Sequence, residues 1–205
     1  GLWFVPAQWD YCGQTFRVRR QLRRVLDDKG HFRAIGGTVI LDGVGTAGNF
    51  SGMISNGSAT TMFVNVLKEG AGAWTFSGTN NSGGATIIKA GGLNLTGLTG
   101  TNSLVVSNGA TLSGTGTVRG IVSVDGTIAP GPAAGIGTLT ISNSLLLNGT
   151  TLVRIAKSPA PTCDRLRGMS TVTYGGALMV TNLGGPLAEG DAFPLFSANA
   201  FNGAF

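Results

Sequence analysis

The chain has 205 residues, of which 42% are hydrophobic, 11% are charged and 35 are glycine, and its formal net charge is +5. Soluble domains average about 25% charged residues and about 7% glycine, so this chain is poor in charge and rich in glycine. Recurrent valine, leucine and isoleucine exclude a disordered chain, and the lack of a three-residue glycine period excludes collagen. No apolar run approaches the roughly 20 residues of a membrane-spanning helix.

The positive charge is concentrated near the start of the chain. Residues 1–34 contain seven of the 14 lysines and arginines but only three of the nine acids. The basic character therefore describes one short segment, and it does not indicate a nucleic-acid-binding protein.

Residues 1–10 are expected to form an arm without regular structure, because their aromatic residues follow no helical or alternating period. Trp3, Phe4 and Trp9 either fold back on the rest of the chain or contact a partner molecule. The pattern leaves both alternatives open.

Residues 16–28 are the one predicted helix. Its apolar residues recur at i, i+4, i+7 and i+8, with arginines between them, and these apolar residues are Val18, Leu22, Val25 and Leu26. Such a helix could cap the first part of the fold. Alternatively Arg17, Arg20 and Arg24 could contact an anionic surface such as a membrane or lipopolysaccharide.

From residue 37 onwards, short β-prone segments follow one another at spacings of about 8–12 residues, separated by glycine-rich and asparagine-rich turns. This spacing predicts an all-β fold. The expected strands are 38–41, 62–67, 73–77, 85–89, 92–95, 103–106, 117–124, 137–141, 150–155, 177–181 and 192–196.

The strands are too short and too closely connected to favour an antiparallel sandwich or barrel, and no crossover helices separate them. A solenoid remains, in which each coil of roughly 20 or more residues stacks on the one before it. Glycines would form its corners. Its inward-facing core residues are predicted to be Trp74, Phe76, Ile87, Leu93, Leu95, Leu104, Val106, Leu139 and Ile141.

The stretch VLKEGAGAWTFSGTNNSGGATIIKAGGLNLTG, residues 66–97, resembles the autotransporter-associated β-strand repeat. The resemblance is carried by a lysine, a Gly-Ala-Gly, alternating apolar residues, Ser-Gly-Thr-Asn and a glycine corner. Residues 50–55 resemble the strand that precedes this unit, and the segments after residue 109 resemble the coils that follow it. The resemblance implies a right-handed parallel β-helix at the surface of a Gram-negative bacterium or released from it.

Two regions follow from these patterns: an arm with a basic amphipathic helix over 1–34, and the β-helix over 35–205. Residues 1–34 do not match the repeat. The chain stops without the membrane β-barrel of a self-exporting autotransporter, so its C-terminus is expected to be truncated.

Candidate catalytic residues are sparse. Glu189 and Asp191 are the only close pair of acids after residue 34 and are interpreted as turn residues. His31 is the only histidine, and a Cys12–His31 pair is the one conceivable nucleophile. One histidine and two distant cysteines, Cys12 and Cys163, make no zinc site, so neither metal nor cofactor is expected.

The sequence thus predicts a non-enzymatic, extracellular or cell-surface structural β-helix that acts as a stalk or passenger in display or adhesion. A self-assembling filament subunit is the alternative, and a polysaccharide-active enzyme is a third, less favoured one. The expected partners are a cell-surface glycan or protein, or the protein itself joined end to end. Nucleic acid is not expected, and any membrane contact is expected to be peripheral.

Overall fold

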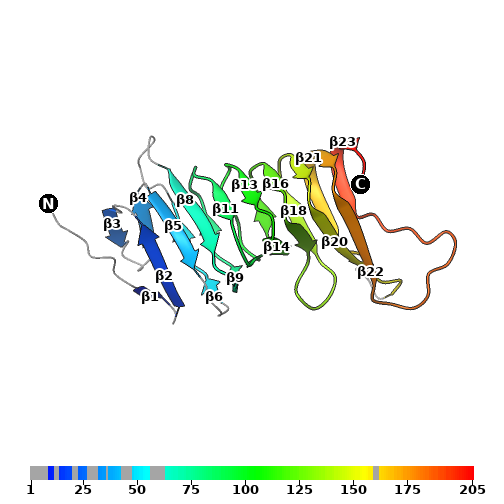
Figure 1. Ribbon diagram of the computed structural model, residues 1–205, viewed down its shortest axis with the longest axis horizontal. Coiled ribbons are helices and arrows are strands. Elements are labelled where there is room, and N and C mark those ends of the chain that lie inside the picture. The colour runs from blue at the N-terminus through cyan, green and yellow to red at the C-terminus, as the bar shows by residue number, and fades with distance from the viewer. Residues whose placement is uncertain are drawn as a thin grey trace.

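The computed structural model describes residues 9–11, 14–19, 23–26, 32–35, 37–42, 48–55, 63–158 and 162–205, with the backbone alone for 9–37 and 42. Every regular element in this part of the chain is a β-strand. The strands follow one another along the long axis of an elongated molecule (Figure 1). The predicted all-β class is therefore confirmed.

Two long sheets contain most of the strands. In spatial order, the longer sheet consists of β1 (Trp9–Tyr11), β2 (Gln14–Arg19), β5 (Gly37–Asp42), β8 (Val64–Glu69), β11 (Thr86–Ile88), β13 (Leu104–Val106), β16 (Val122–Val124), β19 (Leu145–Leu147), β21 (Arg165–Tyr174), β18 (Thr138–Ile141) and β15 (Thr117–Val118), with β23 (Phe196–Gly203) beside β21. The other consists of β22 (Ala177–Asn182), β20 (Thr150–Ile155), β17 (Thr127–Pro130), β14 (Thr111–Gly114), β12 (Gly92–Leu95), β9 (Ala73–Phe76) and β6 (Gly48–Phe50). Two small sheets pair β7 (Met53–Ile54) with β10 (Thr79–Asn80) and β3 (Arg23–Leu26) with β4 (Phe32–Ile35).

Every strand pair formed among β5 and the strands that follow it is parallel, and β8, β11, β13 and β16 each pair with one strand in the coil before and one in the coil after. In the second sheet Trp74 pairs with Leu93, Leu93 with Leu112, and Leu112 with Ile128, so these coils repeat every 16 to 19 residues. The repeat lengthens to 23 residues from Thr127 to Thr150 and to 27 residues from Thr150 to Ala177. Parallel neighbours separated by so little chain leave no room for crossover helices. The arrangement is solenoid-like.

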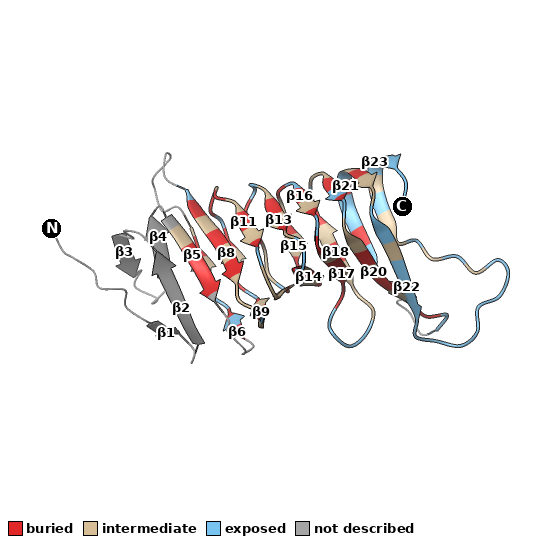
Figure 2. Ribbon diagram, in the orientation of Figure 1, coloured by how far each residue is buried: buried red, intermediate tan, exposed pale blue. Residues whose placement is uncertain are grey.

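Alternation along each strand sends one side chain inward and the next outward. In β12 and β14 the burial alternates intermediate, buried, intermediate, buried. The inward rows form one continuous core of aliphatic and aromatic side chains, which is shown in red along the middle of the stack (Figure 2). Eight of the nine predicted core residues belong to it.

The ninth, Ile87, was predicted to face inward, and this prediction is wrong. In β11 the buried positions are Thr86 and Ile88, while Ile87 between them lies on the outer face. Two adjacent isoleucines give no alternation, so the sequence does not distinguish the inward residue from the outward one. Because the side-chain period of a strand is two, a shift of one residue reverses the assignment.

The helix predicted over residues 16–28 is also wrong where that range is described. Residues 16–19 lie in β2 and residues 23–26 form β3, and both strands pair antiparallel with neighbours. Residues 20–22 and 27–28 lie outside the described residues. Phe16 and Val18 alternate with arginines, a period-two pattern that favours a strand and that the helical interpretation overlooked.

A column of glycines explains part of the unusual composition. Gly52, Gly78, Gly97 and Gly116 occupy the same corner in successive coils, and a Cβ atom on Gly78 would overlap the carbonyl oxygen of Gly52. Gly97 meets Gly78 in the same way. Only glycine permits this close approach of stacked backbones.

Candidate functional site

The predicted partner-contact residues fall in the least described part of the chain. Trp9 lies in β1, opposite Phe16 of β2. Trp3 and Phe4 lie outside the described residues. A contact between this arm and another molecule stays a prediction.

The predicted anionic-surface residues do not share a helix face. Arg17 pairs with Ile40 across β2 and β5, and Arg24 pairs with Ala34 across β3 and β4. Arg20 lies outside the described residues. Their arrangement toward an anionic surface stays a prediction.

The close pair of acids lies in the exposed loop of residues 183–195. Asp191 accepts a hydrogen bond from the Ala188 backbone N–H at 2.7 Å, and its Oδ2 lies 2.9 Å from Lys157 Nζ. These two contacts, the backbone one foremost, lower the pKa of Asp191. Glu189 lies in the turn just before Asp191. The absence of a catalytic role for the two acids stays a prediction.

Metal-ligating chemistry finds no support in the described residues. Within them, no group of three or more histidine, cysteine, aspartate or glutamate side chains lies close enough to hold an ion. Cys163 is a buried free thiol whose Sγ lies 3.7 Å from the Pro194 carbonyl oxygen. His31 and Cys12, the other candidates, lie outside the described residues. No helix in the described part is long and apolar enough to cross a membrane.

The most elaborate polar cluster centres on a buried ion pair. Asp164 is buried, and its Oδ2 accepts hydrogen bonds from the Arg154 backbone N–H and from Arg154 Nε, both at 2.8 Å. Asp164 Oδ1 also accepts from the Gly137 backbone N–H at 2.7 Å. The guanidinium group then donates to the carbonyl oxygens of Pro130 and Pro132, both at 2.8 Å.

This cluster fastens the loop between β17 and β18 to β20 and to the start of β21. Each polar atom of the pair has protein partners, which is the arrangement expected of a structural ion pair. Sequence reasoning missed it, because ten residues separate Arg154 from Asp164 and no motif marks either of them.

A buried lysine, Lys68, lies within residues 66–97. Lys68 is fully buried in β8, and its Nζ donates to the carbonyl oxygens of Glu69, Gly70 and Ala90 at 2.6, 2.8 and 3.1 Å. The ammonium group therefore ties the corner after β8 to the next coil.

The outer face of the longer sheet carries an aliphatic row that sequence reasoning also missed. Leu67 pairs with Ile87, and Ile87 pairs with Val105, all on the outward side of successive coils. The more exposed Leu146 lies further along this sheet in β19, and Ile121, also exposed, directly precedes β16. Neighbours in such a ladder partly cover one another, which accounts for their intermediate exposure.

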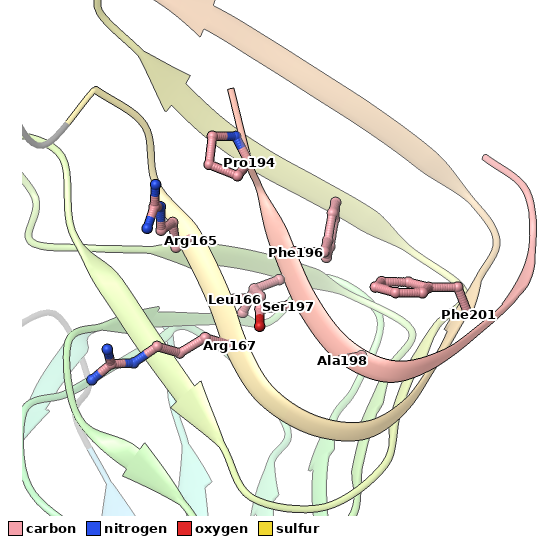
Figure 3. A pocket seen from close by; sticks show the side chains of 8 residues that line it. All are labelled: Arg165, Leu166, Arg167, Pro194, Phe196, Ser197, Ala198 and Phe201. Carbon is pink, nitrogen blue, oxygen red and sulfur yellow. The ribbon is translucent and has the colours of Figure 1, made fainter. Parts of the chain in front are cut away.

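A hollow of about 580 Å³ lies at the C-terminal end of the described stack. Figure 3 shows Phe196 and Phe201 on one side of it, and Arg165 and Arg167 pointing away from them. The hollow spans the rim of β21 and β23 and is widely open, so it has the character of an uncovered strand edge and lacks the enclosed walls of a small-molecule site.

An aromatic cluster borders this hollow. The ring of Tyr174 lies edge-on to Phe196, with centroids 5.1 Å apart, and 4.9 Å from the ring of Phe205. Partial burial raises the pKa of Tyr174. Aromatic rings that contact one another at an open end stabilise that end and leave apolar surface facing solvent.

No protein-family model and no curated protein matches this chain. The resemblance of residues 66–97 to the autotransporter-associated repeat stays a prediction. The described part of the chain contains polar contacts that link neighbouring coils, stacked rows of apolar core residues and a last coil with exposed apolar side chains. Each is suited to holding a stack together or extending it.

Proposed function

We propose that this protein is a non-enzymatic structural solenoid, closed as a right-handed parallel β-helix, that serves as a rigid stalk or passenger segment in display or adhesion. The observation that carries the proposal is the continuous stack of parallel coils from β5 to β23, in which the last pair, β21 with β23, shifts register between Arg167 and Met169. A stack in which every coil bonds to both neighbours resists bending and holds its two ends at a fixed distance.

The extracellular or cell-surface location, on a Gram-negative bacterium, rests on the repeat-like residues 66–97 and is part of the proposal. The outer surface fits such a location. Polar rows link adjacent coils, for example Asn94 Nδ2 to Thr75 Oγ1 at 3.3 Å and Ser77 Oγ to Asn49 Oδ1 at 3.2 Å. A cell-surface glycan or protein would be the partner, with at most peripheral contact to the membrane.

Removing one coil tests the rod. Deleting residues 93–111 would bring Leu112 onto Trp74 in place of Leu93, so that the register of the stack is kept. We expect a folded protein shorter by one strand spacing, about 4.8 Å, measured by small-angle X-ray scattering. The control deletes 93–102, half a coil, and should unfold because it places outward side chains in the core.

Two results would overturn the proposal. If the coil deletion and the half-coil deletion were equally destabilised, the stack would not be modular, and the stalk would lose its structural basis. If the intact chain cleaved surface polysaccharides and lost that activity in a Glu189→Gln or Asp191→Asn variant, it would be an enzyme.

A further inference from the structure

One corner of the solenoid is short in the earlier coils and long in three successive later ones. Residues 115–116 alone connect β14 to β15. The corresponding connections after β17, β20 and β22 are residues 131–137, 156–164 and 183–195, of which 159–161 lie outside the described residues. Because β17, β20 and β22 are parallel neighbours, the three connections leave the stack from the same end of one sheet. We call them the corner loops.

The corner loops are joined to one another by polar contacts. Arg154, at the end of β20, donates from Nη1 to the Pro132 carbonyl oxygen of the first loop at 2.8 Å, and its Nε pairs with Asp164 of the second. Lys157 of the second loop pairs with Asp191 of the third, with Nζ and Oδ2 2.9 Å apart. The three loops therefore form one contiguous group and not three separate excursions.

The corner loops are exposed along most of their described length. Residues 132–135 and 183–190 are exposed throughout, and Figure 1 shows the first and third loops standing out from the stack. The coils that carry the first two loops have a coil on each side, since β17 pairs with β14 and β20, and β20 also pairs with β22. The exposure of residues 132–135 thus belongs to the loop itself.

These insertions add nothing to the core of the stack. The chain turns the same corner after β14 with two residues, so the longer loops are not required for stacking. In solenoid proteins, insertions of this kind gather on one face, which is often the binding face. Binding residues also concentrate on loops held by a rigid scaffold. The buried pair of Arg154 and Asp164 provides such a rigid base.

The side chains of the corner loops have the chemistry of a protein-binding surface. Leu183 and Leu187 are 52% and 46% exposed. Among the described residues of these loops, Glu189 is the only charged side chain outside an ion pair. An apolar centre poor in free charge, with polar groups at its rim, is typical of protein interfaces. A glycan would require several placed hydrogen-bonding side chains, and those of Lys157 and Asp191 already bind each other.

We propose that the corner loops form a docking surface for a protein partner that presents an apolar patch with a basic residue at its rim. The apolar patch covers Leu183, Leu187 and residues 132–135, and the basic residue lies opposite Glu189. The stack holds this surface at a fixed height along the rod. The inference rests on the proposed function, because it identifies the part of the stalk that engages a partner.

A random peptide library displayed on phage and selected against the immobilised full chain supplies the probes. The enriched sequences should combine apolar residues with lysine or arginine. Fluorescence anisotropy of the synthetic peptides then measures their affinity. Each peptide should lose at least tenfold in affinity with Leu187→Asp or with Ala133→Asp, because either change places a carboxylate against its apolar side chains.

The matched control is Leu146→Asp, which changes an exposed leucine of β19 on the outer face of the longer sheet. It should leave the peptide affinities within about twofold of the native values, as expected for a surface site away from the contact. Circular dichroism would establish that all variants are folded.

Charge reversal tests the chemistry assigned to the partner. Glu189→Lys should weaken binding about threefold, the scale of an exposed ion pair. A peptide in which the basic residue is replaced by glutamate should bind this variant better than it binds the native chain.

Peptides whose affinity neither loop variant changes, or which Leu146→Asp weakens as strongly, would overturn the inference. So would a library that yields no enriched sequence. If arrayed glycans bound in a loop-dependent way and peptides did not, the assignment of a protein partner would be wrong. The coil-deletion experiment is independent of these outcomes: a stack that is not modular would remove the stalk even if the loops bound peptides, and a modular stack without loop binding would remove only the docking surface.

Discussion

The middle of the stack and its last coil contain the same kinds of residues at the same positions, yet their exposure differs sharply. Val153 in β20 is 2% exposed and Val180, which stacks on it from β22, is 50% exposed. The residue type and the column are identical. A coil in this fold buries its core residues only when another coil covers it, so burial here depends on the neighbour and not on the strand itself.

The largest expected effect comes from placing a charge in the covered part of the stack. Ile88→Asp should prevent folding, because the carboxylate would be buried without a partner at a position that is 0% exposed. Ile87→Asp provides the matched control, since the adjacent isoleucine lies on the outer face. Circular dichroism and thermal melting of the two variants measure the difference. Equal loss of structure in both would contradict the assigned register.

Removing one partner of the buried ion pair should have the next largest effect. Asp164→Ala leaves the Arg154 guanidinium group without its carboxylate, and we expect a loss of about 3–5 kcal/mol in the free energy of unfolding. Urea denaturation gives this value. The control, Asp125→Ala, removes an exposed acid that bonds only to Asn148 among the described contacts and should change stability by less than about 0.5 kcal/mol.

The double variant Arg154→Met, Asp164→Leu should regain part of this loss, because it leaves no unpaired charge behind. If Asp164→Ala were as stable as the native protein, the cluster would not fasten the loop between β17 and β18.

Replacing Lys68 by methionine should lower the free energy of unfolding by about 1–3 kcal/mol, because it removes the donor shared by the carbonyl oxygens of Glu69, Gly70 and Ala90. Lys89→Met is the matched control. Lys89 pairs with Glu69 at the surface, 3.2 Å away, and such pairs contribute about 0–1 kcal/mol. Chemical denaturation of the two variants compares them. An equal effect would show that the buried amine contributes no more than the surface one.

The same substitution at two stacked positions, one in β20 and one in β22, compares the covered part of the stack with its last coil. Val153→Ala deletes two buried methyl groups and should cost roughly 1.5 kcal/mol, at about 0.8 kcal/mol per buried methylene. Val180→Ala should cost less than half of that, because the side chain is half exposed. Chemical denaturation of the two variants is the measurement. Equal costs would mean that the last coil is covered in solution.

Much of the fold could be predicted from the sequence, because strand spacing and glycine corners are local signals. The strands at 92–95 and 150–155 lie where they were predicted, and β8 begins two residues later than the predicted 62–67. The ten-residue β21 was missed, because its first half, Arg165–Met169, mixes arginine and glycine with the apolar residues. Its apolar positions are set by the coils beneath, through Leu139 under Leu166.

The polar side-chain contacts between coils could not be predicted from the sequence, for a related reason. Arg154 contacts Asp164 across the connection between β20 and β21. Such a contact has no characteristic spacing in the sequence, so it could not be predicted. The open edge of the last coil could not be foreseen either. The sequence ALMVT has the apolar composition of a buried strand. Only the strand order shows that β22 is the last described strand of its sheet.

The smallest expected effect concerns the loop beside this open end. The Ala188 N–H and Lys157 lower the pKa of Asp191 below that of the unfolded chain, about 3.9 for an aspartate. A lowered folded-state pKa means that the stabilisation is complete above the unfolded value and is lost as the pH falls through the folded one. The loop of residues 183–195 should therefore loosen only in acid, below about pH 4, while the stack itself keeps its strands. Carboxyl chemical shifts and loop amide signals, followed by nuclear magnetic resonance from pH 7 to pH 2, test this. An Asp191→Asn variant should show the acid form of the Ala188 amide signal already at pH 7. If the loop signals of the native chain changed near neutral pH instead, a group other than Asp191 would be holding the loop.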